Sequence, residues 1–288
     1  MRHIKLWLTT SRPKTLLLII APIILGAAFA KHHFNWFWFF VTLLSAVCIQ
    51  VGTNFANDYF DHHKGADTTE RLGPKRALQQ GLVTHEQMRV AYWIAFIIAA
   101  LFGCLLVYRT GWPIILIGIA SIASGIMYTA TRYSLAYLGI AEIFVIMFFG
   151  PVATLGTYYV QTLSWNWAVC FAGLAPGCIA TALLVVNNLR DYDQDKKANK
   201  KTLAVRFGKS FAKYEYTALL FAGLLVPLFL HLFFGYSSLI LLSLVLILLA
   251  YKLIRHLYTY QHPSELNTLL ANTGKFALLF CVVIGLTL

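Results

Sequence analysis

The sequence predicts an all-α integral membrane protein, a bundle of transmembrane helices. Of its 288 residues, 59% are hydrophobic and only 12% are charged, whereas about 25% of the residues of a soluble domain are charged. Its apolar runs are continuous and about 20 residues long, the length that a helix needs to cross a bilayer and far longer than a barrel strand. The formal net charge of +12 would suit a nucleic-acid binder. So apolar a chain nevertheless excludes nucleic acid as a partner, and it excludes a soluble enzyme.

Nine apolar runs follow one another along the chain, and we expect each to form one membrane span. They cover residues 15–31, 37–57, 88–108, 112–130, 135–160, 166–188, 214–234, 237–256 and 268–288. The first run has the basic lead and small-residue end of a signal peptide, but the first span of a multi-span chain inserts without cleavage, so we interpret it as a span. The longest polar segments, about 58–87 and 189–213, are too short for a soluble domain. We therefore expect one transmembrane domain over residues 1–288.

Lysine and arginine are distributed unevenly between the loops that connect these runs. Of the 23 in the chain, 20 fall on the side of the N-terminus, Lys31 and Arg109 fall on the opposite side, and Lys275 lies within the last run. Cytoplasmic loops of membrane proteins are enriched in these two residue types. The distribution predicts that the N-terminus and the loops after the second, fourth, sixth and eighth runs are cytoplasmic and that the C-terminus lies outside.

Most of the acidic residues lie in two polar segments, which directly follow the second and the sixth apolar runs. The first segment contains Asn54, Asn57, Asp58, Asp61 and Asp67, and the second contains Asn187, Asn188, Asp191 and Asp195. Helical spacing places Asn54, Asp58 and Asp61 on one helix face, and likewise Asn187 or Asn188 with Asp191 and Asp195. Because the two runs lie four helices apart, the segments suggest a weak twofold repeat. If they face each other, they form an oxygen-rich mouth.

Carboxylates crowded on one helix face repel one another and need a cation. Mg²⁺ favours carboxylate oxygens and keeps coordination positions for water and phosphate oxygens. Basic residues beside both segments are suited to the remaining charge of a phosphate. They are Lys64, Arg71, Lys75, Arg76, Arg190, Lys200 and Lys201. The alternative is two solvated helix ends whose basic residues only set the topology, but two matched segments with asparagine one turn before aspartate favour a site for Mg²⁺ and a diphosphate.

Four other polar residues belong to the apolar runs or lie at their ends. Glu142 is expected about two turns into the fifth run, and ionisable residues within a membrane are functional candidates because they are costly there. Lys275 lies about two turns into the ninth run and can extend its amine to the interface. Tyr128, with Arg132, closes the fourth run on the cytoplasmic side.

These motifs resemble those of the UbiA superfamily of intramembrane aromatic prenyltransferases, and the resemblance covers nearly the whole chain. NDYFDHHKGAD is similar to the first aspartate-rich motif of the family and RDYDQD to the second. RPKTLLLIIAPIILGA resembles its first-helix signature, and YTATR resembles its short tyrosine–basic motif. Nine helices with both acidic loops cytoplasmic are also the architecture of the family.

Within the superfamily, three stretches resemble the branch that prenylates 1,4-dihydroxy-2-naphthoate in menaquinone synthesis. They are KGADTTERLGPKRALQQGLVT, YLGIAEIFVIMFFGPVATLGTYYVQT and NKKTLAVRFG. One departure is Asn199-Lys200-Lys201, where the branch usually has Gly-Lys-Arg. Because Asp67 lies beyond Gly65, direct metal ligation is expected more of Asp58 and Asp61 than of Asp67.

The resemblance implies a bacterial cytoplasmic (inner) membrane enzyme that transfers a polyprenyl group from polyprenyl diphosphate to 1,4-dihydroxy-2-naphthoate, with loss of CO₂ and diphosphate. Its implied metal ligands for Mg²⁺ are Asp58, Asp61, Asp67, Asp191 and Asp195. Its implied diphosphate contacts are Asn54, Asn57, Lys64, Arg71, Arg76, Arg132, Asn187, Asn188 and Lys201. Tyr128 would shield the allylic cation with its ring, and Glu142 would orient a ring hydroxyl or take a proton.

Two alternatives stay open. The same fold could use another aromatic acceptor, such as 4-hydroxybenzoate or homogentisate. An ion-coupled transporter with paired repeats is a different class, but transporters place their coupling carboxylates near the bilayer midplane. Eight of the eleven acidic residues here fall in the two polar segments instead.

Overall fold

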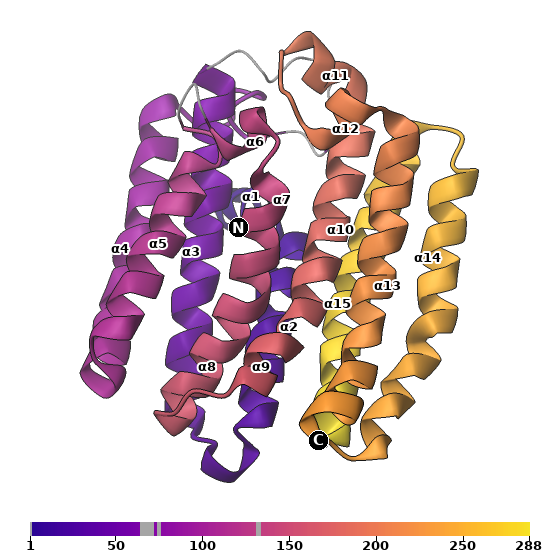
Figure 1. Ribbon diagram of the computed structural model, residues 1–288. Helices are drawn as coiled ribbons and strands as arrows, with labels where there is room; N and C mark the ends of the chain where they lie inside the picture. The colour runs from indigo at the N-terminus through magenta and orange to yellow at the C-terminus, as the bar shows by residue number, and fades with distance from the viewer. Residues whose placement is uncertain (1, 64–71, 74–75, 131–133) are drawn as a thin grey trace.

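The computed structural model covers residues 1–288 and describes all of them except 1, 64–71, 74–75 and 131–133. The described residues are almost entirely helical and include no strand. Figure 1 shows long, roughly parallel helices joined by short helices at one end. The first half of the chain contains α1 (Arg2–Thr10), α2 (Pro13–Phe29), η1 (Lys31–His33), α3 (Trp36–His63), α4 (His85–Thr110), α5 (Trp112–Met127) and α6 (Leu135–Leu138).

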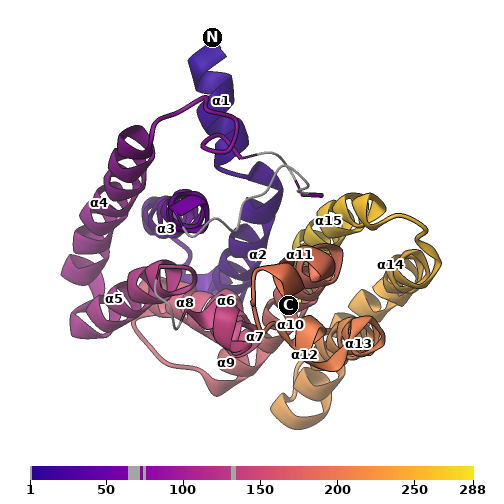
Figure 2. The same cartoon turned by 90° about the horizontal axis from the view of Figure 1, so that it is seen from above.

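The second half continues in the same pattern. It contains α7 (Ala141–Met147), η2 (Phe148–Val152), α8 (Ala153–Thr162), α9 (Trp167–Ala172), α10 (Leu174–Arg190), α11 (Tyr192–Lys197), α12 (Leu203–Phe207), α13 (Lys209–Phe234), η3 (Ser238–Leu246), α14 (Ile247–Thr259), η4 (Pro263–Glu265) and α15 (Leu266–Thr287). Seen from above in Figure 2, α3 lies within a curve formed by α4, α5, α8 and α2, and α13 to α15 stand on the other side of α10.

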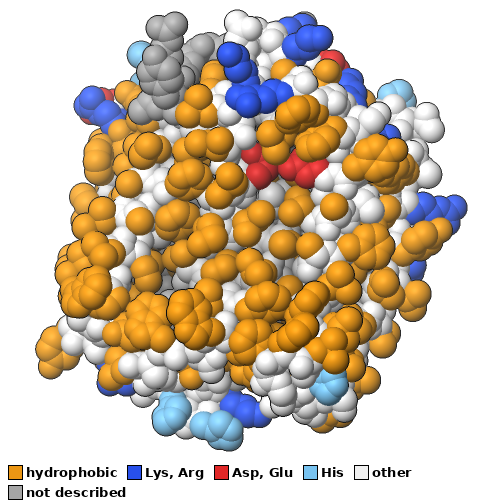
Figure 3. All heavy atoms as spheres, in the orientation of Figure 1, with side chains coloured by type: hydrophobic (Ala, Val, Ile, Leu, Met, Phe, Trp, Pro, Cys, Tyr) orange, Lys and Arg blue, Asp and Glu red, His pale blue; other side chains and the backbone are white. Residues whose placement is uncertain are grey.

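Seven helical stretches of the described chain are long and apolar enough to cross a membrane. The bent pair of α1 and α2, whose axes meet at 60°, would make an eighth span. The fourth predicted span corresponds to α5, which is apolar but has only 16 residues. The structure therefore supports a polytopic membrane protein with seven or eight clear spans, and nine spans remain a prediction. Figure 3 shows a broad hydrophobic belt, with Lys and Arg gathered mostly at the end where α11 and α12 lie.

The fifth predicted span, 135–160, is wrong as a single helix. Its start forms the separate turn α6, which ends at Gly139 in the left-handed conformation with φ 68°. The helix restarts at Ala141 and widens into a π-helical turn at η2, where Gly150 is not helical. Pro151 lies inside this turn, and proline has no N–H to continue the hydrogen-bond ladder.

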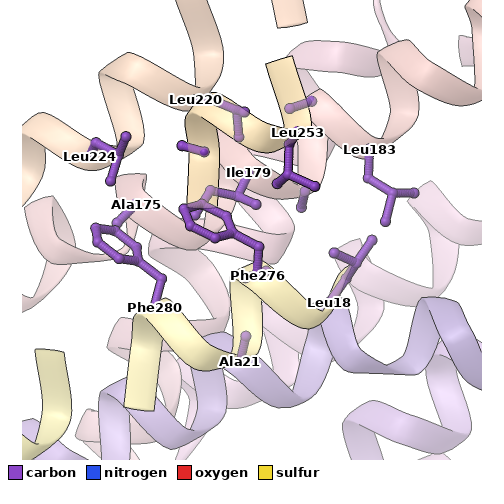
Figure 4. Close-up of a cluster of buried hydrophobic side chains, with 14 of the residues drawn as sticks. Leu18, Ala21, Ala175, Ile179, Leu183, Leu220, Leu224, Leu253, Phe276 and Phe280 are labelled. Carbon is purple, nitrogen blue, oxygen red and sulfur yellow. The ribbon is translucent and has the colours of Figure 1, made fainter. Parts of the chain in front are cut away.

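The largest hydrophobic core joins α2, α10, α13 and α15. Figure 4 shows side chains from these helices packed in one cluster, among them Leu18, Ile179, Leu220, Phe276 and Phe280. In the apolar stretch of the span formed by α9 and α10, 83% of the residues are buried, against 22–50% in the other spans. α10 is therefore the central helix of the bundle. One of its faces packs on this core, and its last turns reach the site described next.

Candidate active site

A cavity of about 710 Å³ lies between α2, α3, α4, α5, α7, α8 and α10. Most of its wall is aliphatic and comes from the membrane-spanning helices. The two acidic segments contribute its carboxylates and most of its carboxamides, and these residues are Asn54, Asn57, Asp61, Asn187, Asn188, Asp191, Gln194 and Asp195. The sequence therefore folds so that both segments face one space, as predicted.

The described part of the first acidic segment is the end of α3, and its Asn54, Asn57, Asp58 and Asp61 side chains are buried. Arg76 lies beside it with 7% of its side chain exposed, and its guanidinium nitrogens lie 3.2 Å from Asp58 Oδ1 and 2.8 Å from Asp61 Oδ2. Arg12 forms a second ion pair with Asp58. Buried carboxylates are costly unless they are paired, and these two arginines provide that pairing. Asp58 is not among the described residues that line the cavity, whereas Asp61 is.

The second acidic segment spans the end of α10. The helix ends at Arg190, but Asp191 N–H still donates to Asn187 O at 3.1 Å and Asp195 N–H donates to Asp191 O at 2.8 Å. The helical register thus continues across the break and keeps Asn187, Asp191 and Asp195 on one face. Arg190 donates to both carboxylate oxygens of Asp191, at 2.8 and 2.6 Å.

Lys200 joins the two segments. Its Nζ lies 3.8 Å from Asp61 Oδ2 and 3.7 Å from Asp195 Oδ1, so these two oxygens are at most 7.5 Å apart. Burial lowers the pKa of the Lys200 amine, but attraction to Asp61 and Asp195 outweighs it and raises the pKa above its ordinary value. Lys200 therefore stays a cation at the point where carboxylates from α3 and α11 converge.

The donor set suits a hard divalent cation. The polar wall presents carboxylate and amide oxygens from both segments. No histidine is among the described lining residues, and the one cysteine among them, Cys104, lies in the second half of α4. Mg²⁺ prefers oxygen ligands, while soft metals prefer thiolate or imidazole. The described residues contain no ready cluster of three His, Cys, Asp or Glu side chains. Residues of both segments would supply the oxygen ligands of such an ion, and the ion would supply positive charge for a phosphate group there.

Three predicted residues take positions that the sequence did not specify. Tyr128 caps α5 and lines the cavity. Glu142 lies in the first turn of α7 rather than two turns into a helix, because the chain breaks at Gly139. It is buried behind the cavity wall and accepts a hydrogen bond from Asn188 Nδ2 at 3.2 Å. Lys201 is exposed, while its neighbour Lys200 faces the carboxylates.

Several predicted residues lie outside the described part of the chain. They are Lys64, Asp67, Arg71, Lys75 and Arg132.

Sequence reasoning also missed contacts that the fold creates. Thr129 donates to Asn57 Oδ1 at 2.7 Å, and Gln194 lines the cavity. Arg12 also lines the cavity. Its backbone is in the left-handed conformation, with φ 55°, just before Pro13. A residue before proline is disfavoured in the right-handed helical region, so the pair Arg12-Pro13 indicates a helix boundary, and this signal could have drawn attention to Arg12.

Fold and site together define a polytopic membrane protein with a carboxylate-lined pocket at one end of an apolar intramembrane cavity. The chain belongs to the UbiA prenyltransferase family, whose match covers residues 19–281. The 1,4-dihydroxy-2-naphthoate octaprenyltransferase of Haemophilus influenzae is 35% identical, over 99% of this chain and 96% of that protein. The enzyme of the same name from Escherichia coli is 34% identical, over 95% of this chain and 91% of that protein.

Solved structures share the fold. A UbiA homologue from Archaeoglobus fulgidus, bound to GPP and Mg²⁺, superposes with a TM-score of 0.69 at 16% identity and covers 98% of both chains. The apo structure of a UbiA homologue from Aeropyrum pernix gives a TM-score of 0.70 at 14% identity, over 95% of this chain and 96% of that one. At these identities the comparison establishes the fold of the bundle.

Proposed function

We propose that this chain is a Mg²⁺-dependent transferase that moves a polyprenyl group from polyprenyl diphosphate to 1,4-dihydroxy-2-naphthoate. A ring carbon bonds to the allylic carbon as the C–O bond to diphosphate breaks, and the carboxyl group of the acceptor leaves as CO₂. The naphthoate substrate is supported by the relatives of that name, which align along nearly the whole chain. The observation that carries the reaction type is the convergence of Asp61 and Asp195 on Lys200 at the polar end of an apolar cavity.

The residues of the site have different proposed roles, which depend on where they lie. Asp61, Asp191 and Asp195, with amide oxygens of Asn54, Asn57, Asn187 and Asn188, would hold Mg²⁺. Bound Mg²⁺ neutralises the charge that develops on a leaving diphosphate. We expect Asp58 to contribute to metal binding less directly than Asp61, because its side chain pairs with Arg12 and Arg76 and is not among the described residues that line the cavity. Those two arginines and Lys200 line the cavity and would bind diphosphate oxygens. Asp67 remains a predicted metal ligand, and Lys64, Arg71 and Arg132 remain predicted diphosphate contacts. Lys201 was predicted as a further contact, but its side chain is exposed, and we propose Lys200 in its place.

The apolar part of the cavity suits the other end of the donor. Its aliphatic walls come from α2, α4, α5 and α8, so a polyprenyl tail would lie there away from water while its head group meets the acidic segments. The ring of Tyr128 lines the same cavity and would shield the allylic cation from water. Glu142 would act on the site through Asn188, because the structure places it behind the wall.

We further propose nine spans in a bacterial cytoplasmic membrane, with the N-terminus and both acidic segments on the cytoplasmic side and the C-terminus outside. The uneven distribution of lysine and arginine supports this orientation. Tagged termini and single cysteines labelled from one side of intact cells would test it. A C-terminus that is labelled only after the membrane is opened would contradict the proposal.

Purified protein in lipid nanodiscs, given 1,4-dihydroxy-2-naphthoate, a polyprenyl diphosphate and Mg²⁺, should form prenylated product and release CO₂. A chelator should stop the reaction and added Mg²⁺ should restore it. The matched control replaces the acceptor with 4-hydroxybenzoate, which should give little or no product. Folded protein that prenylates 4-hydroxybenzoate in preference to the naphthoate would overturn the choice of acceptor, and folded protein that prenylates neither would overturn the function.

A further inference from the structure

Arg190 is a buried arginine of the second acidic segment that does not reach the cavity. It is 3% exposed and is absent from the described cavity wall. Besides the two bonds to Asp191, its guanidinium donates to Asn187 Oδ1 at 2.8 Å and to Asn267 Oδ1 at 2.9 Å. A planar guanidinium with four hydrogen bonds has a fixed orientation. Arg190 is therefore placed to hold the side chains of its own segment rather than a phosphate.

Asn267 links Arg190 to a distant part of the chain. It lies in the first turn of α15, and its Nδ2 donates to Leu72 O at 3.0 Å and to Ser264 O at 3.0 Å. One amide thus accepts from the second acidic segment through its oxygen and donates to the loop after the first segment through its nitrogen. Its orientation is determined, since only the oxygen can accept from a guanidinium and only the nitrogen can donate to a carbonyl.

Gly73 brings the backbone of the loop after the first segment against the Arg190 guanidinium. A Cβ added there would lie 2.8 Å from Arg190 Nη2 and 3.0 Å from its Cζ, so a larger residue would push against a guanidinium that four hydrogen bonds hold in place. Three residues further along the chain, Arg76 ion-pairs with Asp61. The loop that supplies Arg76 to the first segment is thereby attached to the arginine that orients Asp191 in the second.

We propose that Arg190, Asn267 and Gly73 form a clamp that sets the position of the first acidic segment relative to the second. Asn267 and Gly73 are positioning residues that act through Arg190 and the loop at 72–73. This inference rests on the proposed function of the two segments as one site for Mg²⁺ and diphosphate. Residues that orient metal-binding groups without touching the ion commonly change metal affinity by about 10- to 100-fold, and the clamp predicts an effect at the lower end of that range.

The test measures binding of inorganic pyrophosphate with Mg²⁺ to full-length protein in nanodiscs. Asn267→Ala removes both links, and Asn267→Asp keeps an acceptor for Arg190 but removes the donor to Leu72 O. Gly73→Ala pushes the loop away from Arg190. All three should bind pyrophosphate about tenfold more weakly and raise the KM for polyprenyl diphosphate, with the KM for the naphthoate unchanged. Asn272→Ala, on the same helix and without a side-chain hydrogen bond to any described residue, is the matched control and should behave as wild type.

Unliganded thermal stability identifies a variant that is merely misfolded, and Gly73→Ala tests the same contact independently of Asn267→Ala. Wild-type pyrophosphate affinity in both folded variants would overturn the clamp, as would equal rises in the KM of both substrates. Wild-type protein that binds pyrophosphate with Mg²⁺ but prenylates no naphthoate would overturn the proposed function and leave the clamp to be judged by binding. Wild-type protein that does not bind pyrophosphate would overturn both.

Discussion

The two acidic segments look alike in sequence but are held in different ways. The first lies inside the continuous 28-residue helix α3, and its charges are neutralised by residues from elsewhere, including Arg12, 46 positions away. The second straddles the end of α10, and its main partner is Arg190, next to Asp191 in the chain. The first segment therefore depends on the assembled bundle, whereas the second brings its own counter-charge. Matching sequence motifs did not reveal this asymmetry.

The largest expected effect comes from carboxylates that line the cavity. Asp61→Asn and Asp191→Asn keep the shape of the side chain but remove an anionic ligand from each segment, and we expect the rate of prenyl transfer to fall by about 10³-fold or more. We expect a smaller fall in rate for Asp58→Asn, because the Asp58 side chain lies behind the cavity wall and pairs with Arg12 and Arg76. Product formation in nanodiscs measures all three. If Asp58→Asn is the most damaging, the distinction between the cavity wall and the layer behind it is wrong.

The next effect is on stability. Arg76→Ala leaves the buried carboxylates of Asp58 and Asp61 short of a partner, which should cost about 3–5 kcal/mol of folding free energy. Arg190→Ala affects one carboxylate, whose side chain is 11% exposed, and should cost about 1–3 kcal/mol. Unfolding in mixed micelles, followed by tryptophan fluorescence, would rank the two variants. A larger loss for Arg190→Ala would reverse our view of which segment depends more on tertiary contacts.

The membrane class and helix positions could be predicted from the sequence because they depend on local apolar length. The breaks could be predicted less well. Gly139 and Pro151 interrupt the run at 135–160, yet proline and glycine also occur inside intact spans, as Pro22 does in α2. Whether such a residue bends a helix depends on the neighbouring helices that satisfy its backbone, and the sequence of one run does not contain that information.

For the site, the sequence located the acidic residues but not their partners. Asp61 and Asp195 could be found because helical spacing and charge are local properties. That Lys200 faces them while Lys201 is exposed depends on the turn after α11, where Asn199 adopts φ 53°. Asn267, far along the chain, carried no charge and no motif to mark it. Contacts between distant segments follow from packing, which a motif does not encode.

Lys200 and Lys201 offer a matched pair for the next prediction. Lys200→Gln removes the cation between the segments and should raise the KM for polyprenyl diphosphate by about tenfold, while Lys201→Gln, exposed on the same loop, should stay within about twofold. Because the pKa of Lys200 lies above its ordinary 10.5, its ion pairs contribute fully to stability below that pH and lose their contribution only as the pH rises through the raised value. A steady-state kinetic comparison at neutral pH decides between the two lysines. Equal effects would show that the charge of the loop matters and the contact does not.

The smallest expected effect lies inside the second motif itself. Asp193 sits between Asp191 and Asp195 in sequence, but its side chain is 68% exposed and pairs with Lys209 at 3.0 Å on the outside. Exposed ion pairs contribute about 0–1 kcal/mol. Asp193→Asn should therefore leave stability nearly unchanged and keep both kinetic constants within about twofold of wild type, although it alters an aspartate of the motif as Asp191→Asn does. If Asp193→Asn instead reduced turnover as strongly as Asp191→Asn, the presence of an aspartate in the motif would matter more than whether its side chain faces the cavity. The way in which each segment is held would then not explain which of its residues are needed.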